Sequence, residues 1–269
     1  MSTPAAAAAL LDLLRGLGGA VVAFSGGVDS AVVLAAAVRA LGADAVVAAI
    51  ADSPSLARAE LAGARLLADQ LGAELVVLRT DELADPGYRA NAGQRCYFCK
   101  RTVLGAVREL ADRRGLAHVV TGTHRDDHGA AHRPGLRAAA ELGVHEPLAE
   151  VGATKEMVRR LAAYWGLPVW DKPSTPCLAS RIAVGLPVSV QRLALVESAE
   201  LAARGYLAEH QVPVRDLRVR LLGKAGFRVE LDQTALDRVY AAGLLARIAE
   251  VGIGGSGELV LYHCGSLSG

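Results

Sequence analysis

The sequence has few aromatic residues, few cysteines, no long apolar run and almost no net charge, and each of these absences excludes a class of protein. Phenylalanine, tryptophan and tyrosine make up 4% of the 269 residues, whereas hydrophobic residues as a whole make up 52%. Alanine, valine and leucine must therefore build the core. Lysine and arginine number 29 against 28 aspartates and glutamates, so the positive excess that general binding to a phosphate backbone needs is missing. We expect no nucleic acid as a partner.

Membrane insertion and export are not indicated either. The apolar runs 31–38 and 45–51 end at charged residues, far short of the roughly 20 apolar residues that a spanning helix needs. The N-terminus carries no basic stretch of the kind that opens a signal peptide. Four cysteines are too few for a disulfide framework in a chain of this length. We therefore expect a soluble cytoplasmic protein whose cysteines serve a metal or a reaction.

Strand and helix patterns alternate over the first two thirds of the chain. Short apolar runs predict strands, and the segments between them have the composition of helices. This alternation favours a parallel sheet covered by helices on both faces, which is a doubly wound α/β fold. Ligands bind in such folds at the C-terminal ends of the strands. The strands are expected at 21–24, 45–50, 75–78 and 116–120, and the helices at 31–41, 56–71, 102–114, 134–144 and 154–165.

The segment 168–187 interrupts this alternation, because it is rich in proline and too irregular for a helix. We place a domain boundary directly after it, so that a large domain spans 1–187 and a smaller α+β domain spans 188–269. The smaller domain is expected to serve substrate binding or oligomerisation in a homo-oligomer. Its predicted elements are a helix at 189–204, strands at 215–220, 227–231 and 258–262, and a helix that ends near residue 250.

A short loop, Ser25-Gly26-Gly27-Val28-Asp29-Ser30, joins the first expected strand to the first expected helix. Both glycines can take a positive φ and let backbone N–H groups approach a phosphate, and Ser25 and Ser30 add hydroxyl donors. The positive end of the helix dipole favours an anion at the same place. Asp29 would repel phosphate unless a cation intervenes, so we assign it to Mg²⁺ or to water around that ion.

The loop can be a tight turn that binds no ligand, or it can be the phosphate-binding loop of a known family. A turn without a ligand explains the glycines but not the two serines. Neither Gly-x-x-x-x-Gly-Lys-Ser/Thr nor Gly-x-Gly-x-x-Gly is present, which disfavours a P-loop NTPase and a dinucleotide dehydrogenase. Instead, the loop resembles the signature of the PP-loop ATP pyrophosphatases, with their adenine nucleotide alpha hydrolase-like fold. The resemblance implies an enzyme that cleaves ATP to AMP and pyrophosphate, adenylates a substrate oxygen, and lets a nitrogen or sulfur nucleophile displace AMP.

Three of the cysteines are candidates for a functional group. Cys96 and Cys99 form a C-x-x-C between two basic residues, and Cys177 lies in the proline-rich segment. Nearby cations favour thiolates, and the three thiols can meet if the loops that carry them open over the nucleotide. A [4Fe-4S] cluster on three thiolates, zinc with a further ligand, a redox pair, and a metal-free pair that packs a loop all remain open. Cys264 is expected to be an ordinary buried residue of a strand.

Further stretches resemble the LarE sulfur transferases, which belong to the PP-loop enzymes. The resemblance implies that the substrate is pyridinium-3,5-biscarboxylic acid mononucleotide, whose carboxylate is adenylated and then converted to a thiocarboxylate for the nickel-pincer nucleotide cofactor. It extends over most of the chain. The stretches are Tyr88 to Asn91, Arg95 to Lys100, Arg133 to Ala138, Glu141 to Val144 and Lys172 to Ile182.

Two branches of this family differ in their source of sulfur. One branch gives up the sulfur of a single cysteine and is left with dehydroalanine, and the corresponding position here is Cys177. The other branch carries three cysteines around a [4Fe-4S] cluster that relays sulfide. Because Cys96 and Cys99 are present as well, the chain resembles the cluster-bearing branch, with sulfide or a sulfur donor as partner.

Arginines are the expected contacts to anions. Arg218 and Arg220 alternate with apolar residues along a predicted strand and share one face, which is either solvated or a place for phosphate. The resemblance implies that they bind the phosphate of the mononucleotide, which suits bidentate guanidinium geometry. Arg181 follows Cys177 closely and can stabilise the charge that develops at the adenylated carboxylate, with a surface ion pair as the alternative.

Two departures from the family pattern concern the fit of the ligands. Asp126 and Asp127 match an acidic pair near ATP, but His124 occupies the place of an asparagine and can simply be solvated. Leu222 lies where the family has a histidine-containing stretch. The contacts of both ligands at these positions are therefore left open.

Two other functions compete with sulfur transfer to the mononucleotide. A PP-loop tRNA thiolase can also use three cysteines, but the near-neutral charge and the lack of an added RNA-binding domain count against it. A protein that senses metal or stores a cluster, and binds nucleotide without turnover, is the non-enzymatic alternative. The leading hypothesis makes one structural demand: the glycine pair and the three thiols must open into one shared cavity.

Overall fold

The computed structural model describes residues 1–129 and 134–263, so Arg133 and the prediction for Cys264 lie outside the described residues. The chain divides into two compact units. The first unit contains residues 1–82 and 94–174, and the second contains residues 83–93 and the chain from 175 onward. The predicted domains 1–187 and 188–269 stay a prediction, and each unit is described by itself.

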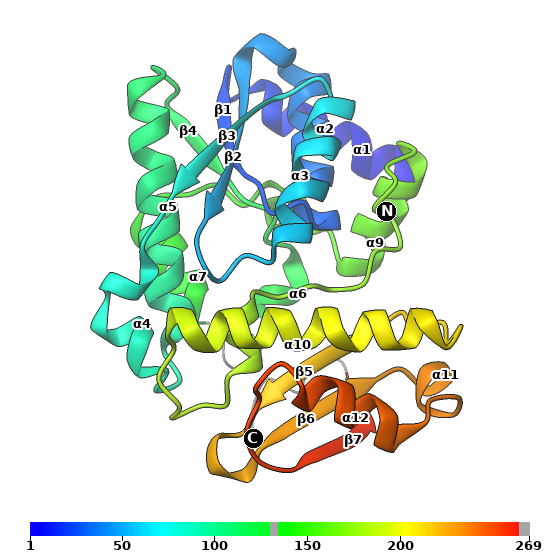
Figure 1. Cartoon of the computed structure of the whole chain (residues 1–269). Helices are drawn as coiled ribbons and strands as arrows, with labels where there is room; N and C mark the ends of the chain where they lie inside the picture. Colours follow the sequence, from blue (N-terminus) through cyan, green and yellow to red (C-terminus); the bar gives the residue numbers. More distant parts are fainter. Residues whose placement is uncertain (130–133, 264–269) are drawn as a thin grey trace. The chain divides into compact units, whose positions relative to one another are not determined.

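Four strands form the parallel sheet of the first unit (Figure 1): β1 (Ala20–Ala23), β2 (Val46–Asp52), β3 (Glu74–Arg79) and β4 (His118–Val120). Their order across the sheet is β3-β2-β1-β4. The chain leaves β1 toward β2 and β3 and returns to the other side of β1 at β4. The direction of winding therefore reverses beside β1, and the carboxyl ends of β1 and β4 border the crevice in which such folds bind ligands. The predicted α/β class is confirmed.

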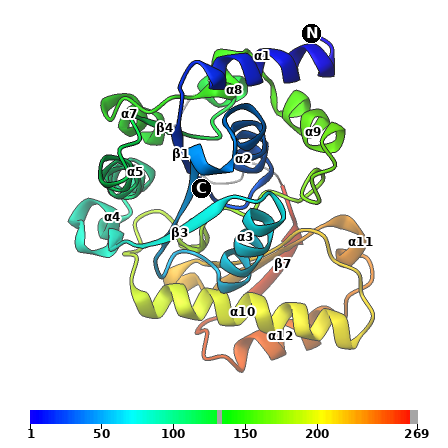
Figure 2. The same cartoon turned by 90° about the horizontal axis from the view of Figure 1, so that it is seen from above.

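Helices cover both faces of this sheet (Figure 2). They are α1 (Thr3–Arg15), α2 (Val28–Leu41), η1 (Ala43–Ala45), α3 (Arg58–Gln70), α5 (Arg95–Arg113), α6 (Arg125–His128), α7 (Pro134–Glu141), α8 (Pro147–Glu150) and α9 (Lys155–Tyr164). Val22 of β1 faces the core that α1, α2 and α9 share, whereas Val21 faces the core under α5. The two-residue period of a strand produces this division, so the strands are apolar at successive positions. No helix among residues 1–129 and 134–263 has the length and apolar character needed to cross a membrane.

Helix α5 begins earlier than the predicted helix at 102–114, at Arg95. The C-x-x-C, which we expected in a loop, therefore occupies the first turns of a helix. Close packing against α7 accompanies this extension: a Cβ added to Gly135 would lie 3.1 Å from Cγ of Lys100 and 3.5 Å from the carbonyl oxygen of Cys96. Propensity along the chain does not foresee such a contact, because the partner helix is distant in sequence.

The second unit has a three-stranded sheet of β5 (Leu217–Leu221), β6 (Phe227–Leu231) and β7 (Gly257–Leu261), in that order. β5 and β6 are antiparallel, and β6 and β7 are parallel. The predicted strands are present with small shifts at their ends. The long helix α10 (Val190–Glu209) packs against β5 and α12. The remaining helices are η2 (Glu82–Ala84), where the chain enters this unit, α4 (Pro86–Ala90), η3 (Leu178–Arg181), η4 (Gly223–Ala225), α11 (Gln233–Leu236) and α12 (Ala241–Ala249).

Asn91 ties the segment 83–93 to the rest of the second unit. Its side chain donates hydrogen bonds to the carbonyls of Ala183 at 2.9 Å and Leu186 at 3.0 Å, and it is 1% exposed. The residue ends α4 with a left-handed backbone, φ 50°, which asparagine tolerates better than most residues. A stretch that interrupts the first unit in sequence thus folds with the second.

Candidate active site

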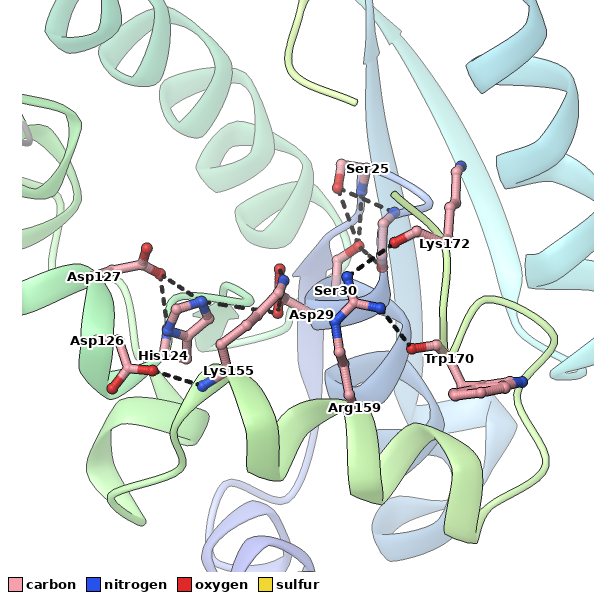
Figure 3. Close-up of polar contacts among 11 residues, drawn as sticks. Ser25, Asp29, Ser30, His124, Asp126, Asp127, Lys155, Arg159, Trp170 and Lys172 are labelled. Carbon is pink, nitrogen blue, oxygen red and sulfur yellow. Dashed lines mark hydrogen bonds and ion pairs between the residues drawn. The ribbon is translucent and has the colours of Figure 1, made fainter. Parts of the chain in front are cut away.

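The loop between β1 and α2 is held in shape by its own serines (Figure 3). Ser30 is 4% exposed, and its Oγ lies 3.2 Å from Oγ of Ser25. The same Oγ accepts from the backbone N–H of Ser25 at 3.2 Å and donates to the carbonyl of Gly27 at 3.1 Å. These bonds close the loop without a ligand, so the site is preformed and little ordering is needed when an anion binds.

Close approach of neighbouring elements explains the glycines. Gly26 has φ 71°, and a Cβ there would lie 3.0 Å from Cβ of Ala64 on α3. Gly27 caps α2 with φ −82°, so only one of the two loop glycines uses the left-handed region. A Cβ on Gly122, after β4, would lie 2.7 Å from the backbone nitrogen of Ser30. The chain after β4 thus presses against the first turn of α2, beside the point where the winding of the sheet reverses.

Asp29, in the first turn of α2, holds a lysine that the sequence pattern did not single out. Nζ of Lys155 donates to both carboxylate oxygens, at 2.7 and 2.6 Å (Figure 3). The side chains of Asp29 and Lys155 are 29% and 35% exposed. The carboxylate supplies the oxygen ligand that Mg²⁺ prefers, and phosphates and water supply the others in many nucleotide sites. Asp29 therefore fits a metal ion, on condition that the ammonium group moves away.

The neighbouring carboxylates bond to the backbone around this pair. Oδ2 of Asp126 accepts from the N–H of Lys155 at 2.8 Å, and Oδ2 of Asp127 accepts from the N–H of His124 at 3.1 Å. His124 is 8% exposed, so its interpretation as a solvated histidine is wrong. Its Nε2 lies 3.6 Å from Oδ2 of Asp127 and 4.0 Å from Oδ1 of Asp29. The role of Asp126 in ATP binding stays a prediction.

A second lysine reaches the loop from the segment after α9. Nζ of Lys172 donates to Oε2 of Glu60 at 2.7 Å and to the carbonyl of Gly26 at 3.4 Å. Arg159 of α9 donates to the carbonyls of Trp170 at 3.0 Å and Lys172 at 3.2 Å (Figure 3). The guanidinium group thereby holds the backbone that carries Lys172. We call residues 170–172 the lysine strap.

Each of the two lysines, Lys155 and Lys172, occupies a position that the sequence marks as unusual. Lys172 opens a stretch that carries the family resemblance, and Lys155 is the first residue of a helix, directly after the capping Thr154. A cation in that position opposes the helix dipole, which marks Lys155 as a residue placed there for another reason. Neither signal indicates that the two side chains lie beside Asp29 and Gly26.

The cysteine pair lies on one side of α5. Cys96 and Cys99 are three residues apart on the helix and therefore neighbours on its surface; Cys96 is exposed and Cys99 is partly buried. Cys177, also partly buried, precedes η3 in the second unit. Two thiols at this spacing fit part of the ligand set of a cluster or a zinc ion. Across 1–129 and 134–263, no three or more His, Cys, Asp or Glu side chains form a group that could hold a metal ion. A meeting of the three thiols, and their opening into one cavity with Gly26, stay predictions.

Stretches that carry the family resemblance meet between α5 and α7. The hydroxyl of Tyr97 donates to Oε2 of Glu141 at 2.8 Å. The guanidinium carbon of Arg137 lies 4.0 Å from the centre of the Tyr97 ring, a cation–π contact. Tyr97, one of the two residues between the cysteines, thus contacts the neighbouring helix α7, and this contact helps to orient the end of α5 that bears both thiols.

Arg181 is 4% exposed, so its interpretation as a surface ion pair is wrong. Its Nε donates to Oε1 of Glu200 at 2.9 Å. Its Nη1 donates to Oγ of Ser180 at 3.0 Å and to the carbonyls of Cys177, at 3.3 Å, and Pro176. The cation therefore holds the backbone on both sides of the cysteine peptide. Its action on an adenylated carboxylate stays a prediction.

Arg218 and Arg220 are 5% and 8% exposed, so a solvated strand face is also wrong. Nε of Arg220 donates to Oε1 of Glu230 at 2.5 Å, and its Nη1 donates to the carbonyl of Ser180 at 2.9 Å. The guanidinium carbon of Arg218 lies 4.6 Å from the centre of the Tyr262 ring. Alternation along a strand places side chains on a face, but it does not tell whether that face is covered.

Burial and the neighbouring charges shift the pKa of Arg218. Burial lowers the pKa of Arg218 from its ordinary value, Tyr262 raises it, and the charges of Arg181 and Arg220 lower it further. Arg218 nevertheless stays charged at neutral pH, because a guanidinium is not deprotonated in proteins. A concentration of buried, fixed cations suits a phosphate, which accepts bidentate hydrogen bonds from arginine.

A cavity of about 440 Å³ lies elsewhere on the first unit. None of the residues of the loop 25–30 lines this cavity. The lining residues are Arg125, His128, Val144, Glu146, Ala149 and Glu150.

Comparisons with known proteins place this geometry in a family. The family model for NAD synthase matches residues 14–88, the part that contains β1, the loop and α2. An uncharacterised protein of Synechocystis sp. is 42% identical over 73% of this chain and 72% of its own length. The pyridinium-3,5-bisthiocarboxylic acid mononucleotide synthase of Lactiplantibacillus plantarum is 34% identical over 85% of this chain and 79% of its own length. An uncharacterised protein of Methanocaldococcus jannaschii is 25% identical over 74% of each chain. The chain therefore belongs to the LarE family of PP-loop enzymes, the family of the pyridinium-3,5-bisthiocarboxylic acid mononucleotide synthase.

Proposed function

We propose that the chain is an ATP- and Mg²⁺-dependent sulfur transferase that adenylates a carboxylate of pyridinium-3,5-biscarboxylic acid mononucleotide and converts it to a thiocarboxylate. The observation that carries this proposal is the preformed loop 25–30 with Asp29 and two lysines beside it. The name of the relative from L. plantarum, a bisthiocarboxylic acid mononucleotide synthase, supports the substrate and the product.

The groups around the loop support the first half-reaction. The N–H groups at the start of α2 and the ammonium groups of Lys155 and Lys172 receive the phosphates of ATP. Asp29 would hold Mg²⁺, and the ion would supply positive charge against the negative charge of the departing pyrophosphate. The substrate carboxylate attacks the α-phosphorus, the bond to the β-phosphate oxygen breaks, and an acyl-adenylate forms. Hydrosulfide then displaces AMP, gives up its proton to solvent, and leaves a thiocarboxylate.

The second unit supports recognition of the other phosphate. Arg218 and Arg220 supply fixed cations for the phosphate of the mononucleotide, because burial and their bonds to neighbouring groups orient them in advance. Arg181 stabilises the negative charge that develops at the adenylated carboxylate. These assignments predict that substitution of Arg218 raises the Michaelis constant for the mononucleotide more than it raises the Michaelis constant for ATP.

We assign Cys96, Cys99 and Cys177 as the residues that would hold a [4Fe-4S] cluster, and such a cluster would supply sulfide for the second half-reaction. Anaerobic purification tests this assignment: about four irons per chain with a broad brown absorbance, lost in Cys96→Ala, support the cluster. One zinc per chain would overturn it. Loss of one sulfur from Cys177 after turnover, seen as dehydroalanine by mass spectrometry, would assign the sulfur to that side chain instead.

The whole proposal is tested by product formation. Purified protein is incubated with ATP, Mg²⁺, sulfide and the mononucleotide, and we expect pyrophosphate release together with a product in which one oxygen is replaced by sulfur. Release without the mononucleotide, with no such product, would contradict the proposal. Thiolation of added tRNA would favour a tRNA thiolase, and absence of pyrophosphate release under all conditions would favour a sensor.

We also propose that the protein acts in the cytoplasm as a homo-oligomer. The small number of cysteines and the use of ATP support the compartment. Light scattering coupled to gel filtration tests the assembly, and a monomer at micromolar concentration would contradict it.

A further inference from the structure

The ion pair between Asp29 and Lys155 engages the two groups that nucleotide binding needs. The carboxylate that is to meet Mg²⁺ and the ammonium group that is to meet phosphate neutralise each other at 2.6 and 2.7 Å. Both side chains are in contact with solvent, at 29% and 35% exposure. A pair with this exposure contributes little to stability, so its members can change partners at small cost.

The backbone of Lys155 is fixed, while its side chain is the part that can turn. The N–H donates to Asp126, and the residue begins α9 directly after the capping Thr154 (Figure 3). The N-terminal end of α9, where Lys155 lies, carries the positive end of the helix dipole and therefore attracts anions and disfavours a cation. Lys155 is therefore placed where an arriving phosphate finds both a helix terminus and an ammonium group.

Other charged groups near Asp29 do not take the place of this lysine. Nε2 of His124 is 4.0 Å from Asp29 and lies closer to Asp127, at 3.6 Å. Nζ of Lys172 is bonded to Glu60 and to the backbone of Gly26. Among these groups, the shortest contact to Asp29 is made by Lys155.

We propose that Lys155 exchanges partners: it binds Asp29 in the nucleotide-free chain and the phosphates of ATP in the bound chain, so that Asp29 becomes available to Mg²⁺ only when nucleotide is present. This inference rests on the proposed use of ATP and Mg²⁺. Without nucleotide, a divalent cation has to displace an ammonium group that is in contact with the carboxylate. With nucleotide, the phosphates attract the lysine and supply the remaining metal ligands. Metal binding thus follows nucleotide binding.

The variant Lys155→Met tests the exchange through two binding measurements with opposite expected signs. Mn²⁺ binding without nucleotide, followed by electron paramagnetic resonance, becomes about tenfold tighter because Asp29 is released. ATP binding in EDTA, followed by calorimetry, becomes about tenfold weaker because the phosphates lose a cation. The same substitution at the exposed Lys224 of η4 leaves both values unchanged. Lys155→Gln gives the same two changes if the first variant folds poorly.

The loss of ATP affinity in Lys155→Met has two possible causes: the phosphates lose the contact with Lys155, or the Asp29 carboxylate, left without its cation, repels them. The variant Asp29→Asn separates the two causes, because it removes the carboxylate charge. ATP in EDTA binds it more tightly than wild type, and adding Lys155→Met removes this gain. If the second substitution has no effect on ATP affinity in this background, the exchange is wrong. A wild-type chain that binds no ATP overturns both this inference and the proposed function. A wild type that binds ATP and forms thiocarboxylate, with variants that bind Mn²⁺ and ATP as it does, overturns the exchange alone.

Discussion

The ion pairs of the two units differ in how firmly they are held. At the loop of the first unit, the side chains of Asp29 and Lys155 are 29% and 35% exposed, and those of Lys172 and Glu60 are 24% and 21% exposed. In the second unit, Arg220 and Glu230 are 10% and 5% exposed. Lysine carries the charge in the first case and arginine in the second. Exposed lysine pairs are cheap to open, whereas a buried arginine pair cannot lose one member without leaving a charge uncompensated.

This difference matches the tasks that we assign to the two units. A nucleotide binds and leaves as AMP and pyrophosphate in every turnover, so its site needs cations that can be released. A substrate phosphate that is only held in place needs cations in fixed directions. Three variants test this assignment of easily opened and firmly held charge, and a fourth tests a helix cap of the second unit.

The largest effect on stability is expected from Arg220→Met. Its removal leaves Glu230 buried without its cation and the carbonyl of Ser180 without its donor, and breaking such a pair costs about 3–5 kcal/mol. Denaturation in urea measures it. Arg228→Met is the matched control, because Arg228 pairs with Glu258 at 41% and 50% exposure, and it should stay within about 0.5 kcal/mol. Equal losses in both variants would remove the distinction between buried and exposed pairs.

Asp29→Ala is expected to lower pyrophosphate release by about 100-fold or more, since the charge that stabilises bound metal is lost. Iron content and the free energy of unfolding should stay near those of wild type, because the side chains of the pair with Lys155 are about one third exposed. Asp12→Ala removes an exposed carboxylate of α1 and serves as control. Loss of iron together with activity would mean that Asp29 is a structural residue.

Arg159→Ala is expected to raise the Michaelis constant for ATP about tenfold while kcat changes little, an effect of about 1.4 kcal/mol. The reason is that the lysine strap loses its two hydrogen bonds and Lys172 is no longer held beside Gly26. Arg159→Lys should restore part of the affinity. Arg160, exposed on the same helix, gives the control Arg160→Ala. Unchanged ATP affinity in Arg159→Ala would show that the strap needs no anchor.

The smallest effect, about 1 kcal/mol, is expected from Asp232→Ala, which removes the side-chain cap of α11. Burial alone would raise the pKa of Asp232, but backbone N–H donors, Asp216 and Arg215 foremost, lower it below the ordinary 3.8. A carboxyl group whose pKa is lowered by folding makes its full contribution to stability at pH values above its pKa in the unfolded state. It loses that contribution as the pH falls through its pKa in the folded state. The difference between wild type and variant should therefore be constant above about pH 5 and shrink below pH 3.8. A difference that grows on acidification would contradict this assignment.

Local patterns predicted the strands and several of the longer helices, and the reason is visible at particular residues. Val21 and Val22 face opposite cores, so β1 had to be apolar at successive positions, and the loop after it had to contain a glycine beside Ala64. Such requirements act on residues close together in the sequence, so the local residue pattern shows them. The α/β class, the parallel sheet and the strands of the second unit follow from them.

Contacts between distant residues were not predictable in this way. Lys155 meets Asp29 across 126 positions, and Lys172 meets Gly26 across 146. The burial of Arg218 and Arg220 depends on what covers β5, which alternation along one strand does not contain. The start of α5 depends on its packing against α7. In each case the missing information is tertiary, because the energy comes from a partner that the local sequence does not specify.

The hydrogen bonds of Asn91 have a consequence for any attempt to divide the protein. A fragment that begins at Thr175 lacks Asn91, so the carbonyls of Ala183 and Leu186 lose their amide donor. A fragment that stops at Ser174 keeps Asn91 but removes its acceptors and exposes a polar side chain that folding had enclosed. Neither half can be cut out cleanly at a single peptide bond, and the gene for one unit cannot be exchanged with that of a relative unless the short stretch 83–93 travels with it.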